Sequence, residues 1–134
     1  MKLARLYTLD RRGKIRIKDI EILEDNGYGV ILTSYGQYGG KMTTKKKNII
    51  KGSNLGKSNE LTPYERAKLL AKGMYNETRC GDAYKNIFDL KHICKDDARF
   101  LSYKDVGYNS DQKDIDNAAI DIINAYPDDV YTNP

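Results

Sequence analysis

The sequence predicts an α+β fold, in which a small antiparallel sheet of three to four strands packs against one main helix and a helical, acidic extension follows. Two observations support this class. Up to about Ile50 the apolar residues alternate with polar ones, as in half-buried strands, and from Thr62 onward they recur at helical spacing. We therefore expect a sheet-and-helix domain at residues 1–84 and an extension at residues 85–134.

The first two predicted strands differ in the regularity of their patterns. Residues 3–9 alternate loosely enough to indicate a strand with an irregularity, which ends at the turn 10–13. In the second strand Ile17 belongs to one phase of the alternation, whereas Ile20 and Ile22 belong to the other. A one-residue bulge produces such a flip, so the pattern predicts one long, bent strand.

Two glycine-bearing turns predict the rest of a meander. Asp25-Asn26-Gly27 is a strong signal for a tight hairpin, so residues 28–35 should return antiparallel. Gly39-Gly40 leads into residues 42–50, whose Lys45-Lys46-Lys47 run suits an edge strand. Lysine on an edge also discourages sheet-to-sheet aggregation, so this run has a structural explanation as well as a functional one.

The main helix is predicted by its start signal. After a loop at residues 52–59, Thr62-Pro63-Tyr64-Glu65 combines a capping box with proline at the first helical position. The apolar residues behind it predict a helix over about residues 62–79 that lies across the sheet. Farther on, the spacing permits a short helix around residues 87–94 and another that ends before Pro127.

The charge is divided unequally along the chain. Residues 1–57 hold thirteen Lys and Arg against five Asp and Glu, while residues 58–134 hold ten against fourteen. This asymmetry predicts different partners for the two parts, and a polyanion suits the first. The alternative is that the charges only solvate opposite faces of the molecule.

The sequence favours no metal, cofactor or catalytic centre. Cys80 and Cys94 lie fourteen residues apart, and His92 is two residues before Cys94, which matches no zinc pattern. Neighbouring acids such as Asp96-Asp97 rarely converge on one substrate, so we expect no enzyme activity and two reduced, partly buried cysteines. No apolar run is long enough for a membrane span and the first residues lack a secretory signal, so we expect a cytoplasmic protein.

The most informative segment is Tyr35-Gly36-Gln37-Tyr38-Gly39-Gly40-Lys41. Glycine lets the backbone approach a ligand, tyrosine rings can stack on bases, and lysine attracts phosphate. Six lysines and no acid lie between Lys41 and Lys57. Of the two tyrosines, we expect one in the core and Tyr38 at the surface as the contact, because glycines flank it at a turn.

This segment and a second one resemble the WGR domain, a small sheet-and-helix module known from DNA-dependent poly(ADP-ribose) polymerases. The resemblance is closer to the WGR-like region that precedes the catalytic core in some bacteriophage ATP-dependent DNA ligases. That region has a Tyr-Gly-Gln-x-Gly-Gly-Lys segment and a Lys-Gly-x-Asn-x-Gly-Lys-x-Asn-Glu-x-Thr-Pro segment, which read here as residues 35–41 and 51–63. The resemblance covers about residues 1–84 and implies DNA binding beside replication or repair enzymes.

The chain departs from the family where the family's tryptophan and arginine contact DNA near strand ends. Tyr35 and Gln37 stand there, so stacking is retained and the guanidinium contact is not. The ligase nucleophile motif Lys-x-Asp-Gly is absent, because the sequence contains no Asp-Gly dipeptide. The resemblance thus implies a non-catalytic module that binds DNA more weakly than the family does.

We therefore predict non-catalytic, sequence-independent DNA binding by a phage-encoded protein. The alternative is a protein-interaction adaptor or inhibitor whose acidic residues 85–134 bind a host or phage protein, and a virion component is a third interpretation. The DNA contacts, made mainly to the phosphate backbone, are predicted to be Tyr35, Gln37, Tyr38, Lys41, Lys45, Lys46, Lys47, Lys51 and Lys57.

Overall fold

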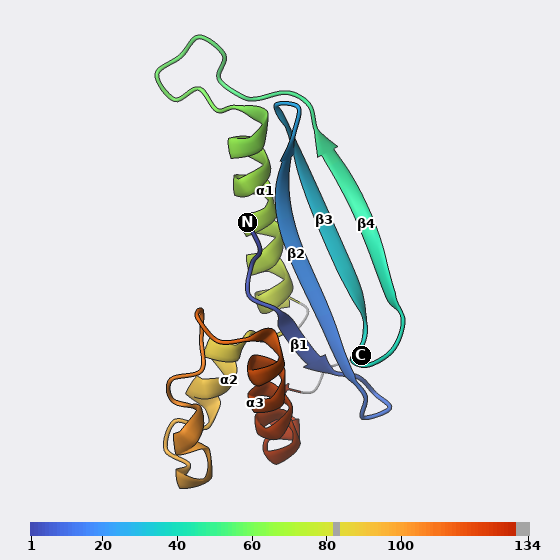
Figure 1. Cartoon of the computed structure of the whole chain (residues 1–134), viewed down its shortest axis with the longest axis vertical. Coiled ribbons are helices and arrows are strands. Elements are labelled where there is room, and N and C mark those ends of the chain that lie inside the picture. The colour runs from blue at the N-terminus through green and yellow to red at the C-terminus, as the bar shows by residue number, and fades with distance from the viewer. Residues whose placement is uncertain (82–83, 131–134) are drawn as a thin grey trace.

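A four-stranded antiparallel sheet forms the centre of the molecule, with the strand order β1-β2-β3-β4 of a simple meander (Figure 1). The computed structural model describes residues 1–81 and 84–130 and confirms the α+β class. The strands are β1 (Leu6–Leu9), β2 (Ile15–Asp25), β3 (Tyr28–Gln37) and β4 (Met42–Ile49).

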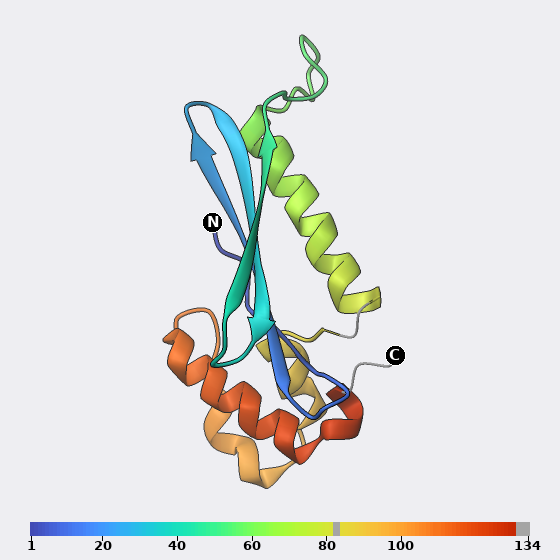
Figure 2. The same ribbon diagram turned by 90° about the vertical axis from the view of Figure 1, so that its right-hand side faces the viewer.

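The helices follow the sheet in the chain and lie in two places around it. The main helix runs along one side of the sheet, while the C-terminal helices gather at the end where β1 lies (Figure 1 and Figure 2). The helices are α1 (Pro63–Gly81), α2 (Ile87–Ile93), the 3₁₀ helix η1 (Ala98–Tyr103), α3 (Gln112–Ala125) and α4 (Pro127–Val130).

The strongest local signals are confirmed. Asn26 and Gly27 have φ angles of 50° and 85°, which is the geometry of a tight two-residue hairpin between β2 and β3. At the start of α1 the Thr62 N–H donates to the Glu65 carboxylate at 3.1 Å, and the Glu65 N–H donates to the Thr62 hydroxyl at 3.1 Å. These reciprocal bonds are the capping box that the sequence predicts.

The prediction of a bulge in β2 is wrong. β2 pairs with β3 residue for residue along its length, without an extra residue on either strand. The apolar phase flips because different helices cover the two faces of the sheet. Ile17 packs with the C-terminal helices, whereas Ile20 and Ile22 pack with α1 on the other face.

The irregularity predicted for the first strand is confirmed, and it lies before β1. Leu6 stands opposite Lys18 in the β1–β2 register, but the earlier bridge joins Lys2 to Glu21. Four steps along the first segment therefore oppose three steps along β2, as in a bulge. The extra residue lets the N-terminal segment continue along the same edge of the sheet.

The first core lies between α1 and the half of the sheet near the β2–β3 hairpin. Small residues let the helix approach closely: a Cβ added at Gly29 would lie 2.5 Å from the Ala67 Cβ and 2.6 Å from the Pro63 carbonyl oxygen. Four isoleucines of three strands meet two alanines of the helix. These buried residues are Ile20, Ile22, Ile31, Ile49, Ala67 and Ala71.

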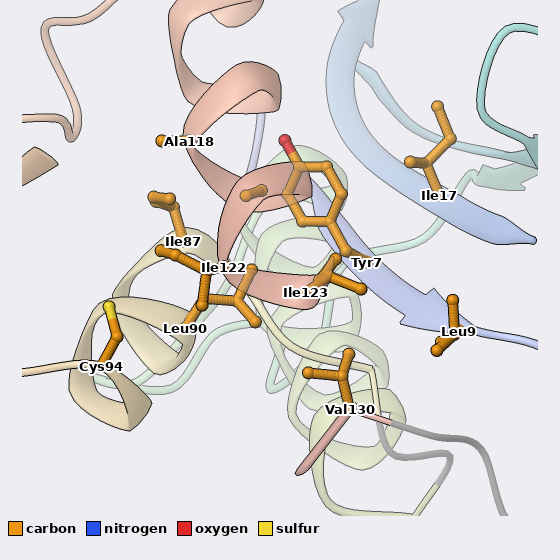
Figure 3. Close-up of a cluster of buried hydrophobic side chains, with 11 residues drawn as sticks. Tyr7, Leu9, Ile17, Ile87, Leu90, Cys94, Ala118, Ile122, Ile123 and Val130 are labelled. Atoms are coloured by element: carbon orange, nitrogen blue, oxygen red, sulfur yellow. The ribbon is translucent and has the colours of Figure 1, made fainter. Parts of the chain in front are cut away.

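The second core lies on the opposite face, between the other half of the sheet and the C-terminal helices (Figure 3). The sheet contributes Tyr7, Leu9 and Ile17, and α3 contributes Ile122 and Ile123. All five side chains are buried, which removes them from water and stabilises the contact. The apolar face of α3 is thus already used inside the protein.

A largely buried ionic network joins α3 to the sheet beside this core. The Tyr7 hydroxyl donates to the Asp116 carboxylate, and Arg5 donates to Asp116 at 2.9 Å and to Asp19 at 2.9 and 3.0 Å. Burial raises the pKa of Tyr7, and its bond to the Asp116 carboxylate raises that pKa further. The phenol therefore remains a neutral donor, and the C-terminal helices are held to the sheet by polar as well as apolar contacts.

No helix among residues 1–81 and 84–130 is long and apolar enough to cross a lipid bilayer.

Candidate nucleic-acid interface

The predicted lysine run forms an exposed edge of the sheet. β4 is the last strand, and every side chain from Thr43 to Asn48 is exposed. The register places Lys45 and Lys47 opposite Thr33 and Ile31, on the face that carries α1. Lys46 points to the other face, so the three ammonium groups flank the edge on both sides.

These lysines have no acidic partner in the part of the chain that the structure describes. The sequence contains no Asp or Glu from Asn26 to Asn59, a stretch that includes β3, β4 and the following loop. None of the ion pairs between described residues involves Lys41, the β4 lysines, Lys51 or Lys57. The positive charge along this edge is therefore uncompensated at short range.

The cations are spread along the length of the sheet. At about 3.3 Å per residue, the eight residues of β4 extend over about 26 Å. Lys41 precedes β4, whereas Lys51 and Lys57 follow it on the loop that projects beyond the start of α1 (Figure 1). The structure therefore separates Lys51 and Lys57 from the glycine-tyrosine turn that the sequence placed in the same site.

The glycine-tyrosine turn connects β3 to β4 at the other end. Gly39 has a φ of 79°, and the Gly40 N–H donates to the Gln37 carbonyl oxygen at 2.9 Å, which closes a tight turn. The Tyr38 side chain is 36% exposed, as predicted for the contact residue. Its N–H donates to the Ile15 carbonyl oxygen at 2.8 Å, so the turn is fixed to the beginning of β2.

Tyr35 lies on the α1 face of the sheet rather than in the core. It is half-buried, and the Lys45 Nζ lies 5.6 Å from the centroid of its ring, in a cation–π arrangement. In the register Tyr35 stands opposite Lys18, and Gln37 stands opposite Arg16. These side chains occupy the part of the α1 face that belongs to the half of the sheet near β1.

Sequence reasoning missed four basic residues at this end of the sheet. The β1–β2 turn lies beside the β3–β4 turn, and the residues that line a shallow depression there are Asp10, Arg11, Arg12, Lys14, Arg16 and Gln37. The guanidinium groups that Gln37 does not provide are therefore present beside it. A usable signal existed, since in an antiparallel meander the first and third turns fall at the same end.

The acidic residues of the C-terminal region are partly used in internal contacts. The Arg99 guanidinium and the Tyr126 hydroxyl both donate to Asp97, which holds the pKa of that carboxyl well below its usual range. Asp116 belongs to the buried network. The region is thus a packed layer of the protein, and the remaining exposed acids lie on its outer surface.

No group of three or more His, Cys, Asp and Glu side chains suited to a metal ion occurs in the described ranges 1–81 and 84–130. Cys94 is buried, but Cys80 is exposed near the end of α1, which corrects the expectation that both thiols are partly buried. The exposed His92 is on α2.

Comparison with protein-family models, with curated proteins and with solved structures found no match to this chain.

Proposed function

We propose that this protein binds DNA without catalysis and without sequence preference, through the lysine-bearing edge of β4 and the turn that precedes it. The observation that carries the proposal is a row of exposed lysines without an ion pair among the described residues: Lys41 before β4, Lys45 to Lys47 within it and Lys51 after it, on an edge strand about 26 Å long. A small anion would need convergent donors at one point. A line of separated cations suits a polymer that presents phosphates at regular intervals.

The type of side chain supports binding that is independent of sequence. Lysine is a flexible point charge that contacts phosphate oxygens. Contacts to the phosphate backbone of DNA position a protein without reading the bases. Tyr38, exposed at the turn, adds a flat ring on which a base or sugar of any identity can stack. The predicted contacts therefore combine charge along the edge with stacking at one end.

The resemblance to WGR domains supports the same proposal from the sequence side. It suggests a phage-encoded protein that acts in the cytoplasm of the host with DNA replication or repair enzymes. The two segments that carry it, residues 35–41 and 51–63, lie at opposite ends of β4. DNA that follows this edge would contact both.

The proposal is tested by measuring DNA binding as a function of salt concentration. Four or five phosphate contacts would make the binding constant fall with about the fourth power of salt concentration. The triple variant Lys45→Glu, Lys46→Glu and Lys47→Glu should abolish binding of a short duplex. A matched control replaces Lys95, Lys104 and Lys113, three exposed lysines of the C-terminal region, by glutamate.

The control has the same net charge as the triple variant but keeps the β4 edge intact. It should retain most of the affinity and most of the salt dependence. A binding constant that does not change with salt, or an equal loss in both variants, would show that the β4 lysines only protect the edge from aggregation.

A further inference from the structure

The depression between the β1–β2 and β3–β4 turns concentrates positive charge. Its volume is about 440 Å³, and it opens widely to solvent. Four of its six lining residues are cationic, one is the amide Gln37, and one is the acid Asp10. Charge, donors and a concave shape therefore coincide at one end of the sheet.

Asp10 organises the turn. Its carboxylate accepts the backbone N–H groups of Arg12 and Lys14, both at 2.9 Å, and its own N–H donates to the Lys14 carbonyl oxygen at 2.9 Å. The second carboxylate oxygen lies 4.0 Å from the Arg16 guanidinium. The Asp10 carboxylate thus shapes the loop and pairs only weakly with Arg16.

The donors also suit one class of anion. The guanidinium group of arginine is a planar fork of N–H donors that matches two oxygens of a phosphate, and such charge-assisted bonds are stronger than neutral ones. Arg16 stands directly opposite Gln37 in the β2–β3 register, so a guanidinium and an amide donor emerge side by side from the sheet. The backbone of both turns is fixed by hydrogen bonds, so the donors stem from an ordered base.

We propose that this depression is a phosphate-binding site, formed by the side chains of Arg12, Lys14 and Arg16 with the amide of Gln37. The inference of phosphate binding depends only on the residues that line the depression. Only the identification of DNA as the source of the phosphate rests on the function proposed above. The β4 edge begins one turn away, at Lys41 and Met42. A DNA strand that follows the lysines of this edge would therefore end at these arginines.

The test is an NMR titration of the whole protein with inorganic phosphate and with pyrophosphate, at ionic strength matched with sodium chloride. Saturable shifts should occur in the amide signals of residues 10–16 and 37 and in the arginine Nε–H signals. The variant Arg12→Gln with Lys14→Gln should bind pyrophosphate at least tenfold more weakly. Both side chains are exposed, and Arg12 and Lys14 bond to Asp10 through backbone groups, so the turn should persist.

The control variant, Lys95→Gln with Lys113→Gln, has the same net charge and should bind pyrophosphate like the natural chain. Shifts that do not saturate, or an equal loss in both variants, would overturn the proposal. A second titration adds a short DNA duplex to the pyrophosphate complex. Displacement of pyrophosphate from residues 10–16 would identify nucleic acid as the source of the phosphate.

If the duplex binds the lysine edge but leaves pyrophosphate in place, the site takes free phosphate compounds. If the duplex does not bind at all while pyrophosphate does, the phosphate site stands and the DNA-binding function fails. The two proposals are therefore separated by one set of spectra.

Discussion

The two halves of the sheet are built on the same strands but covered on opposite faces. Near the β2–β3 hairpin, α1 covers one face through isoleucine and alanine contacts. Near the β1–β2 turn, the C-terminal helices cover the other face through a larger core. A single uninterrupted strand, β2, serves both cores, because its apolar residues change face between Ile17 and Ile20.

The two cores also differ in how polar groups take part. The core under α1 consists of aliphatic side chains packed onto a close helix–sheet contact, and it depends on shape. The C-terminal core is attached through the network of Tyr7, Arg5, Asp116 and Asp19 as well. The first half should therefore be sensitive to added volume, and the second to the loss of a charge partner.

The largest effect is expected for Asp116 of α3, whose carboxylate accepts hydrogen bonds from Arg5 and from Tyr7 of the sheet. Asp116→Ala leaves the Tyr7 hydroxyl and part of the Arg5 guanidinium without an acceptor, and we expect it to lower the free energy of unfolding by about 3 kcal/mol. Tyr7→Phe removes only one donor and should cost about 1 kcal/mol. Urea unfolding measures both. If Asp116→Ala costs no more than Tyr7→Phe, the network does not hold α3.

The next effect tests shape in the first core. Gly29→Ala places a methyl group 2.5 Å from the Ala67 Cβ, so α1 must shift, at a cost of about 1–3 kcal/mol. Gly73→Ala is the matched control, because it lies on the exposed side of the same helix with no atom within 4 Å of the new Cβ. It should stabilise the protein by up to about 1 kcal/mol. Opposite signs in thermal unfolding support the close contact; a loss in both would contradict it.

A smaller effect distinguishes the two faces of the lysine edge. Tyr35, Gln37, Lys45 and Lys47 lie on the α1 face, so DNA that uses this face should lose more from Lys45→Gln with Lys47→Gln. The slope of log affinity against log salt should fall by about 1.8 for two lost phosphate contacts. The comparison variant is Lys46→Gln with Lys2→Gln, which removes two cations from the other face. An equal change in slope would mean that DNA also contacts the face opposite α1, from Lys46 on β4 to Lys2 at the β1 side of the sheet.

The smallest effect concerns pH and the contact between α1 and α2. Burial acts to raise the pKa of Asp89, but its bonds to Arg79, at 2.6 and 3.0 Å, and to the Asn86 N–H outweigh burial and lower that pKa. Asp89 therefore stabilises the fold above the ordinary carboxyl pKa of about 3.9, and this contribution is lost as pH falls through the lowered value.

Asp89→Asn should remove that part of the acid sensitivity. Circular dichroism between pH 6 and pH 2, taken as about the range in which carboxylates titrate, would show unfolding of the natural chain that depends more on pH than unfolding of the variant. Parallel curves for the two proteins would indicate that the Arg79–Asp89 pair contributes nothing measurable, as is common for partly exposed ion pairs.

Local chemistry made much of the fold predictable from the sequence. The Asn26-Gly27 turn and the capping box at Thr62 were placed correctly because each depends on residues that are adjacent in the chain. The bulge was predicted wrongly because period-2 patterning reports which face is buried, not what covers it. Only the tertiary arrangement shows that a second layer causes the flip.

The candidate site was predictable only where it depends on residues that are close in the chain. The lysine edge follows from one strand and its charge, and the structure places these lysines on an exposed edge. The basic residues of the β1–β2 turn join Gln37 only through the pairing of β2 with β3. That long-range contact lies outside any single motif, although the order of turns in a meander already implied it.

Because the apolar residues of β2 change face between Ile17 and Ile20, the number of residues between these two apolar sets must stay even. Lys18 and Asp19 separate the two apolar sets, and they reach opposite layers: Lys18 bonds to Thr78 of α1 at 3.5 Å, and Asp19 bonds to Arg5 of the buried network. Deleting one of them would bring both apolar sets onto the same face of the sheet. Either α1 or the C-terminal helices would then lack apolar side chains of β2 to pack against. Deleting both would preserve the alternation, so natural variation in length at this point should come in pairs of residues.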